Sequence, residues 1–209
     1  MYDSKRRLPR LKRQQKRIGY SMDAWNLPTS VNVAEVDWDI RTDFRIVIDV
    51  LIAFDNPEYD NAESWLYAMM SMVVDFDNLP EELYTQMCEA LNAFIDMGIK
   101  EEKYKTNRKV MDWEQDASLI VTAVNKVVGH EIRAEKYMHW WTFLASYLEI
   151  DNKCLYSHIL QIRSKKAMGK KLEKWEQQFY IENKSLIDIK RKLSAEEEEE
   201  RKQLEEIFG

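Results

Sequence analysis

The residue types that most often do chemistry are present in this chain, but they do not form a catalytic or metal-binding pattern. None of the three histidines, His130, His139 and His158, stands in the His-x-x-x-His or His-Glu-x-x-His frame of a zinc hydrolase. The two cysteines, Cys88 and Cys154, are isolated, which predicts reduced thiols in a cytosolic protein. The five glycines include no Gly-x-Gly-x-x-Gly and no phosphate-binding loop, which argues against a nucleotide-dependent enzyme.

Paired carboxylates could act in acid–base catalysis or hold a metal ion. They occur as Asp37 and Asp39, as Asp75 and Asp77, and as Asp112, Glu114 and Asp116. In a chain with 37 acidic residues, such pairs are expected by chance at helix starts. The last group precedes a predicted helix, where the helix dipole favours negative charge. We therefore expect helix capping there, no cofactor and no enzymatic activity.

The segment 137–148 is the densest in aromatic residues and reads Tyr-Met-His-Trp-Trp-Thr-Phe-Leu-Ala-Ser-Tyr-Leu. It lacks Gly and Pro, which predicts a helix from about Arg133. Helical spacing would place five of its apolar side chains on one face: Tyr137, Trp140, Trp141, Leu144 and Leu148. Adjacent tryptophans span a wide arc, so this helix is either the centre of a core or a large binding surface.

Apolar faces predicted on at least five other helices could surround this aromatic helix, which favours the core interpretation. The candidate core residues are Trp113, Tyr137, His139, Trp140, Trp141 and Leu144. We expect His139 to be a partly buried polar group that is hydrogen-bonded to a neighbouring element. Nothing in the sequence supports a pH-sensing or ligand-binding role for it.

The composition favours helices over a turn-rich β fold. The chain is 45% hydrophobic and 33% charged, with only five Gly and four Pro. We predict a mainly α protein, a single helical domain of about six to eight helices with a small N-terminal β-hairpin. No run approaches the roughly 18 apolar residues of a membrane span, and the N-terminus lacks the apolar region of a secretory signal.

The turn and capping residues give approximate element boundaries. A hairpin is expected over residues 31–40 around Ala34-Glu35, although the Asn-Gly turn that would make it certain is missing. Thr42 is expected to cap a helix that runs to about Phe54. Further helices are predicted over residues 61–74, from Pro80 to Gly98, from Trp113 to Val128, and from Asp151-Asn152 to Arg163.

Residues 170–193 contain neither Gly nor Pro and carry a heptad-like apolar stripe. The stripe can pack on its own domain or mediate association with a partner or a second copy, and the pattern fits both. The candidate partner-binding residues are Leu172, Trp175, Phe179, Leu186 and Ile189. Ser194 and Glu197 then resemble a capping box that opens an acidic terminal helix with Leu204, Ile207 and Phe208 as its apolar residues.

The charge is distributed unevenly along the chain. Residues 1–18 hold eight Lys and Arg against one acid, Asp3, for a net charge of +7, so the other residues carry −13 of the total of −6. We divide the chain into a flexible basic N-terminal extension (1–26), a helical core domain (27–168), and a long amphipathic C-terminal helix or helices with an acidic end (169–209). Folding of the arm back on the acidic body is favoured over nucleic-acid binding through phosphates.

The residues alone thus indicate a non-enzymatic, helical interaction protein of the cytosol, and they do not identify its partner. Several segments, read in order, resemble the bacteriophage gp-fifteen family of helical proteins from the tail-morphogenesis region of long-tailed phages. The similar segments are Leu27-Pro28-Thr29-Ser30-Val31, Arg41-Thr42-Asp43-Phe44-Arg45, residues 112–117, Met138-His139-Trp140-Trp141-Thr142-Phe143, residues 159–163 and residues 176–180.

The resemblance covers about Leu27 to Lys184. Ala34-Glu35 lacks the Gly of the family's turn, and the basic arm and acidic terminus inherit nothing from it. The resemblance implies a tail assembly chaperone in the host bacterial cytoplasm that binds the phage tape measure protein, with tail tube subunits and self-association as further expectations. The alternatives are a structural tail or connector subunit retained in the virion, and a protein that binds nucleic acid weakly through its basic arm.

Overall fold

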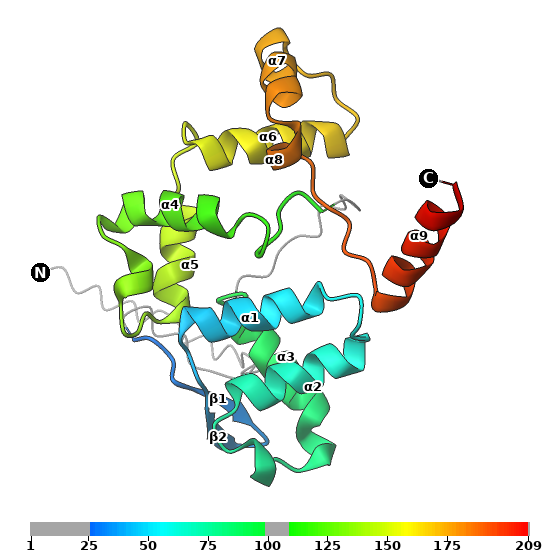
Figure 1. The fold of residues 1–209 in the computed structure, drawn as a ribbon. Helices are drawn as coiled ribbons and strands as arrows, with labels where there is room; N and C mark the ends of the chain where they lie inside the picture. The colour runs from blue at the N-terminus through cyan, green and yellow to red at the C-terminus, as the bar shows by residue number, and fades with distance from the viewer. Residues whose placement is uncertain (1–25, 99–108, 209) are drawn as a thin grey trace, which may run out of the picture.

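A computed structural model describes residues 26–98 and 109–208 (Figure 1). The predicted basic extension lies outside these residues except for Asn26, as does most of the charged segment 101–109. The described part is mainly helical with one two-stranded antiparallel hairpin near its start. The predicted fold class is therefore confirmed.

The strands are β1 (Ser30–Val33) and β2 (Val36–Asp39). The α-helices are α1 (Phe44–Phe54), α2 (Asn61–Met72), α3 (Tyr84–Ile95), α4 (Ala117–Val128), α5 (Trp140–Leu148), α6 (Leu155–Ala167), α7 (Lys174–Glu182), α8 (Lys184–Ile187) and α9 (Ala195–Phe208). Short 3₁₀ helices span Phe76–Asn78, Glu81–Leu83 and Ile132–Ala134.

The hairpin closes through Ala34 and Glu35, which have φ angles of 51° and 65°. Two positive φ angles are what a type I′ turn requires, and they explain why Asn-Gly is the usual sequence there. The hairpin forms without that sequence because its inward residues Val31 and Val33 are buried in the core. The strand then continues to Ile40, which forms a β-bridge with Val73 directly after α2.

Several helix starts differ from their predicted positions. Asp43, rather than Thr42, caps α1 by accepting a hydrogen bond from the Arg45 N–H, while the Thr42 hydroxyl is hydrogen-bonded to the Tyr137 hydroxyl. The helix predicted from Trp113 begins at Ala117, because the Asp112 carboxylate accepts the N–H groups of residues 114 and 115 and holds a turn there. The helix predicted after Asp151-Asn152 begins at Leu155 and is capped by the Cys154 sulfur.

The aromatic helix α5 begins at Trp140, not near Arg133, because His139 is its N-cap. The His139 Nδ1 accepts the Trp141 N–H at 3.0 Å, and the Nε2 therefore carries the proton that is donated to the Pro28 carbonyl at 2.9 Å. His139 is buried and hydrogen-bonded to a neighbouring element, as expected. Since Pro28 precedes β1, the histidine ties the start of α5 to the hairpin.

The two tryptophans of α5 complete the end of α3. The Trp140 indole N–H donates to the Ile95 carbonyl and the Trp141 indole N–H donates to the Phe94 carbonyl, both at 2.8 Å. The last carbonyls of a helix have no partner within it, so buried helix ends need donors from elsewhere. The adjacent tryptophans therefore satisfy the end of α3 while their rings fill the core.

Of the other predicted core residues, Trp113 and Leu144 lie in or against the core and Tyr137 does not. Trp113 packs against Trp140, Phe143 and Tyr147, and Leu144 is half-buried against the main core. Tyr137 is 54% exposed and is not part of the core. It precedes α5, so the helical spacing that placed it on the face of Trp140 and Trp141 does not apply to it.

Capping by His139 leads to a prediction for pH dependence. Burial lowers the pKa of His139 below its ordinary value of about 6.5, and the hydrogen bond to the Pro28 carbonyl opposes this shift only in part. The unfolded chain therefore takes up this proton at a higher pH than the folded chain does. The contribution of neutral His139 to stability is present above about pH 6.5 and decreases as the pH falls below that value.

We expect the wild-type protein to lose stability relative to a His139→Asn variant between about pH 7.5 and pH 5. Asparagine is a good N-cap residue and does not titrate, so the comparison removes the contribution of all other groups. Urea unfolding of both proteins across this pH range measures the difference. A difference that stays constant with pH would contradict the lowered pKa of His139 in the folded chain.

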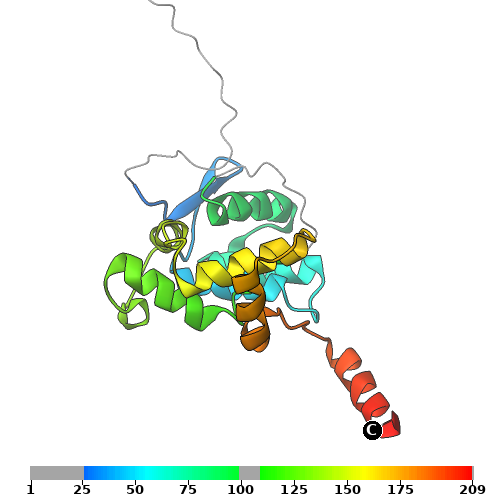
Figure 2. The same ribbon diagram turned by 90° about the horizontal axis from the view of Figure 1, so that it is seen from above.

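The arrangement of the helices separates the C-terminal part from the rest. α1 packs on α2 and on α5, and α4 packs on α5. α6 lies above α4 in Figure 1 with α7 beyond it, α8 packs beside α6, and α9 projects away from the body in both views (Figures 1 and 2). Ser194 and Glu197 form the predicted capping box of α9, and the Ala195 N–H donates to Glu58.

Candidate protein-binding surface

The residues predicted to bind a partner do not lie on one continuous helix. α7 ends at Glu182, α8 covers only four residues, and residues 188–194 are not helical. Leu172, Phe179 and Leu186 pack against a small core formed by Ile159, Ile162 and Ile187. These three side chains therefore pack within their own chain, which is the first of the two alternatives that the sequence left open.

Two predicted residues and one unpredicted residue remain accessible. Trp175 is 52% exposed on α7, where its ring meets the edge of the His158 ring. Ile181, near the end of α7, is 64% exposed. Ile189 is half-buried and lines two neighbouring surface depressions. Ile181 was missed because it falls outside the heptad positions, and no other sequence signal marks it.

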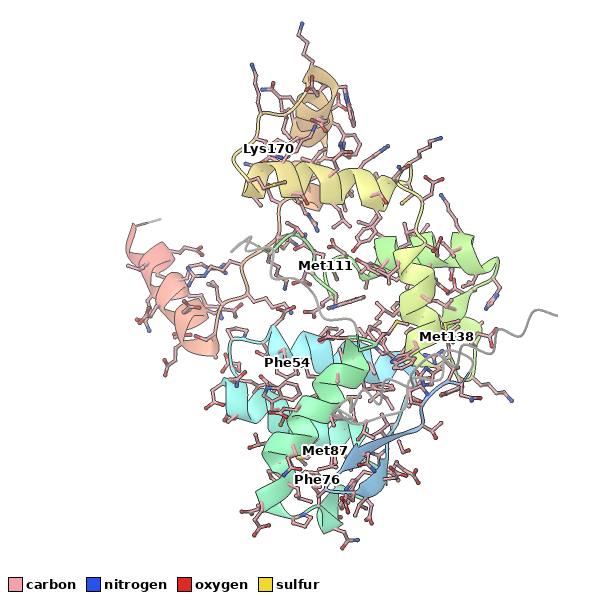
Figure 3. All side chains as sticks on the ribbon, turned by 180° about the vertical axis from the view of Figure 1, so that it is seen from behind. Phe54, Phe76, Met87, Met111, Met138 and Lys170 are labelled. Carbon is pink, nitrogen blue, oxygen red and sulfur yellow. The ribbon has the colours of Figure 1, made fainter. Side chains whose placement is uncertain are left out.

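The first depression, here called the α7–α8 groove, is open to solvent and has apolar and charged walls. It is lined by Ile181, Glu182, Lys184, Ser185, Asp188, Ile189 and Lys190. The second is lined by Phe54, Asp55, Asn56, Pro57, Lys109, Asp112, Ile189, Lys190, Arg191 and Lys192. Phe54 lies at the end of α1, where its ring meets the Trp65 ring of α2, and it is labelled below Met111 in Figure 3. Ile189 and Lys190 line both depressions, so the two depressions adjoin each other on the surface.

Arg163 of α6 holds this surface on the rest of the molecule. Its guanidinium forms a bidentate ion pair with Asp116, with N–O distances of 2.6 and 2.9 Å, and both side chains are buried. The same guanidinium donates to the carbonyls of Leu186, Ile187 and Val110. Asp116 was predicted only as a helix-capping acid. One arginine thus joins α4, α6 and the end of α8.

Two further ion pairs connect α6 to α7 and to the residue that follows α8. Lys165 Nζ donates to both oxygens of the buried Glu176 carboxylate at 2.7 and 2.8 Å. Burial would raise the pKa of Glu176, but the hydrogen bonds from Lys165 and from the Glu173 N–H outweigh it and the pKa lies below its ordinary value. Lys166 pairs with Asp188 at 2.7 Å and lies over the Tyr180 ring.

α7 therefore presents exposed apolar residues while Lys165 and Lys166 hold it on α6. Lys170 marks the loop that leads into it, at the edge of the molecule in Figure 3.

Within residues 26–98 and 109–208, no three His, Cys, Asp or Glu side chains are grouped so that they could hold a metal ion. In the same residues, no helix is long and apolar enough to cross a membrane. The exposed apolar residues of α7 beside the α7–α8 groove are therefore a candidate surface for contact with another protein.

Comparison with known families decides the assignment. The family profile described as Bacteriophage Gp15 protein matches residues 24–189. The chain belongs to the bacteriophage Gp15 protein family. Searches among curated proteins and among solved structures give no match.

The Gp15 match includes the hairpin, the His139-Trp140-Trp141 segment and the whole α6–α8 region, and it ends at Ile189. It leaves out residues 1–23 and residues 190–209, which contain the basic arm and α9. The resemblance seen in the sequence is confirmed at the level of the family.

Proposed function

We propose that this Gp15-family protein is a non-catalytic tail assembly chaperone that binds the phage tape measure protein in the host bacterial cytoplasm. The observation that carries the proposal is the pair of exposed apolar residues on α7, Trp175 and Ile181, beside the α7–α8 groove. Family membership supports a role in a phage particle or its assembly. Tail tube subunits are a second expected partner.

The tape measure protein, which the family resemblance implies as partner, has a chemistry that sets what this surface must offer. A tape measure protein is a long helical chain with apolar stripes, which aggregates until the tail tube encloses it. A chaperone for such a chain needs accessible apolar side chains on a rigid support, and it must release its partner later. α7 meets both needs, since Lys165 and Lys166 hold it on α6 while Trp175 and Ile181 face outward.

The accessible residues of the predicted set are the proposed contacts. Trp175 is the expected anchor because tryptophan contributes strongly to interfaces, and Ile181 and Ile189 extend the surface. Leu172, Phe179 and Leu186 serve indirectly, since they attach α7 and α8 to the small core of Ile159, Ile162 and Ile187.

We expect Trp175→Glu and Ile181→Glu each to weaken capture of the co-expressed tape measure protein by about tenfold or more. Both side chains are exposed, so the variants should keep the wild-type melting temperature. The readout is a pull-down with tagged chaperone, quantified by the ratio of the two proteins. Leu148→Glu, on α5 and 60% exposed, is the matched control and should leave capture unchanged.

Unchanged capture by both α7 variants would remove this surface from the interface. The proposed role has a separate test in purified phage particles, from which an assembly chaperone should be absent. Finding the chain there in stoichiometric amounts would instead identify a structural tail or connector subunit.

A further inference from the structure

The outer face of α2 carries an unusually apolar surface. Leu66, Tyr67, Met70 and Val74 are exposed, with Met70 at 56%, and Tyr59 stacks on Tyr67 at the start of the helix. Positions 66, 67 and 70 fall within a little over a quarter of the helix circumference, and Val74 follows just after the helix ends at Met72. We call these five residues the α2 face. Exposed side chains scattered singly are ordinary, but a contiguous stripe of this kind indicates a contact surface.

The α2 face lies in a strongly acidic region. Residues 46–98 contain eleven Asp and Glu and no Lys, Arg or His. Exposed acids stand at both ends of the stripe: Asp60 and Glu63 at the start of α2, and Asp75 and Asp77 after its end. A segment that covers this face must therefore offer apolar side chains together with positive charge.

One described element near the α2 face does not meet these requirements. α9 begins beside Tyr59, since the Ala195 N–H donates to Glu58. Its first turns contain the acidic run Glu196–Glu200, which would place like charges against Asp60 and Glu63. Repulsion between like charges disfavours α9 as the cover of this face.

The N-terminal segment of the same chain has the required chemistry. Residues 1–18 carry a net charge of +7, and Leu8, Leu11 and Ile18 stand among the basic residues. The apolar residues are spaced by three and by seven, as are side chains that meet one apolar stripe. Both the charge and the apolar content of this segment complement the α2 face.

The segment also joins the fold close to the α2 face. Thr29 is hydrogen-bonded to Ile40, and Ile40 forms a bridge with Val73, so the chain enters about 10 Å from the end of the stripe. Residues 19–28 can span up to about 3.3 Å each, which is more than this distance. The α2 helix itself is about 18 Å long, a length that residues 5–18 can follow.

We propose that residues 5–18 dock on the α2 face of their own chain. Leu8, Leu11 and Ile18 cover Met70 and its neighbours, while the Lys and Arg residues face the acids at the two ends of the stripe. The arm thereby shields an apolar surface of the protein, and the contact weakens as salt screens the charges.

The test is zero-length carbodiimide coupling in the full-length protein, which joins Lys amines to carboxylates in contact. Lys5, Lys12 and Lys16 should couple to Glu63, Asp75 and Asp77, as identified by mass spectrometry of tryptic peptides. A Leu66→Ser/Met70→Ser variant should reduce this coupling by about fivefold or more, and so should about 0.5 M NaCl. The matched control is Leu148→Ser, which removes an exposed apolar residue on α5 and should leave the coupling unchanged.

A Lys12→Glu/Arg13→Glu variant tests the same contact without changing the folded body, and coupling from Lys5 and Lys16 should fall in it. Three results would overturn the proposal. Coupling of these lysines mainly to α9 would reassign the arm. Coupling unaffected by both variants would exclude specific docking. Coupling mainly between ¹⁴N- and ¹⁵N-labelled copies would show docking on a second chain.

Discussion

Replacing Trp140 with alanine is expected to lower the free energy of unfolding by about 3–5 kcal/mol. The side chain is among the largest that are fully buried, and its ring contacts Trp113 and Phe143. The substitution leaves a cavity at the centre of the core and also removes the donor to the Ile95 carbonyl at the end of α3. Urea denaturation monitored by circular dichroism measures the loss.

Two further variants separate these effects. Trp140→Phe keeps an aromatic ring but removes the indole N–H, and a loss of about 1–3 kcal/mol is expected for the unsatisfied carbonyl. Leu148→Ala, at the exposed end of the same helix, should change stability by less than about 0.5 kcal/mol. An unchanged free energy of unfolding for Trp140→Ala would contradict the placement of Trp140 at the centre of the core.

Arg163→Met is expected to have an effect of similar size, about 3–5 kcal/mol, because it leaves the Asp116 carboxylate buried without a counter-ion. It also removes the donors to the carbonyls of Leu186 and Ile187. Since those carbonyls belong to α8, binding through the α7–α8 groove should weaken together with stability. Thermal unfolding and the tape-measure pull-down report the two losses.

The double variant Arg163→Met/Asp116→Leu removes both charges and should recover much of the stability lost in Arg163→Met. Arg133→Met is the control, because Arg133 pairs with Glu131 at the surface and its loss should shift the midpoint little. If Arg163→Met were as mild as Arg133→Met, the Asp116–Arg163 pair would not be the link between α4 and α6.

Local patterns in the sequence predicted most of the elements. The end of α4 at Val128, where Gly129 adopts the left-handed conformation, and the Ser194–Glu197 capping box depend on neighbouring residues, and both agree with the sequence predictions. Errors arose where a distant contact or a side-chain cap changed a boundary. α5 starts seven residues later than predicted, because His139 caps it and bonds to Pro28, 111 residues away.

The candidate surface could be predicted only in part. The apolar stripe of residues 170–193 indicated a contact, and the sequence left open whether it was with the same chain or with a partner. The chain breaks at Asn183, so Leu186 reaches the small core from α8, while α7 itself directs Phe179 toward that core and leaves Trp175 and Ile181 exposed. Heptad spacing assumes one straight helix, so it could not distinguish these residues.

What the sequence determined by itself is the mainly helical class, the hairpin, the aromatic segment as core and the resemblance to the Gp15 family. These follow from periodicity, capping residues and short motifs, which act over a few residues. Only the tertiary structure decided that Trp140 and Trp141 complete α3, that Asp116 pairs with Arg163, and which apolar side chains stay exposed. The first two contacts join residues about fifty positions apart, and the exposure of the apolar side chains depends on how one helix covers another. A local sequence pattern cannot predict such contacts.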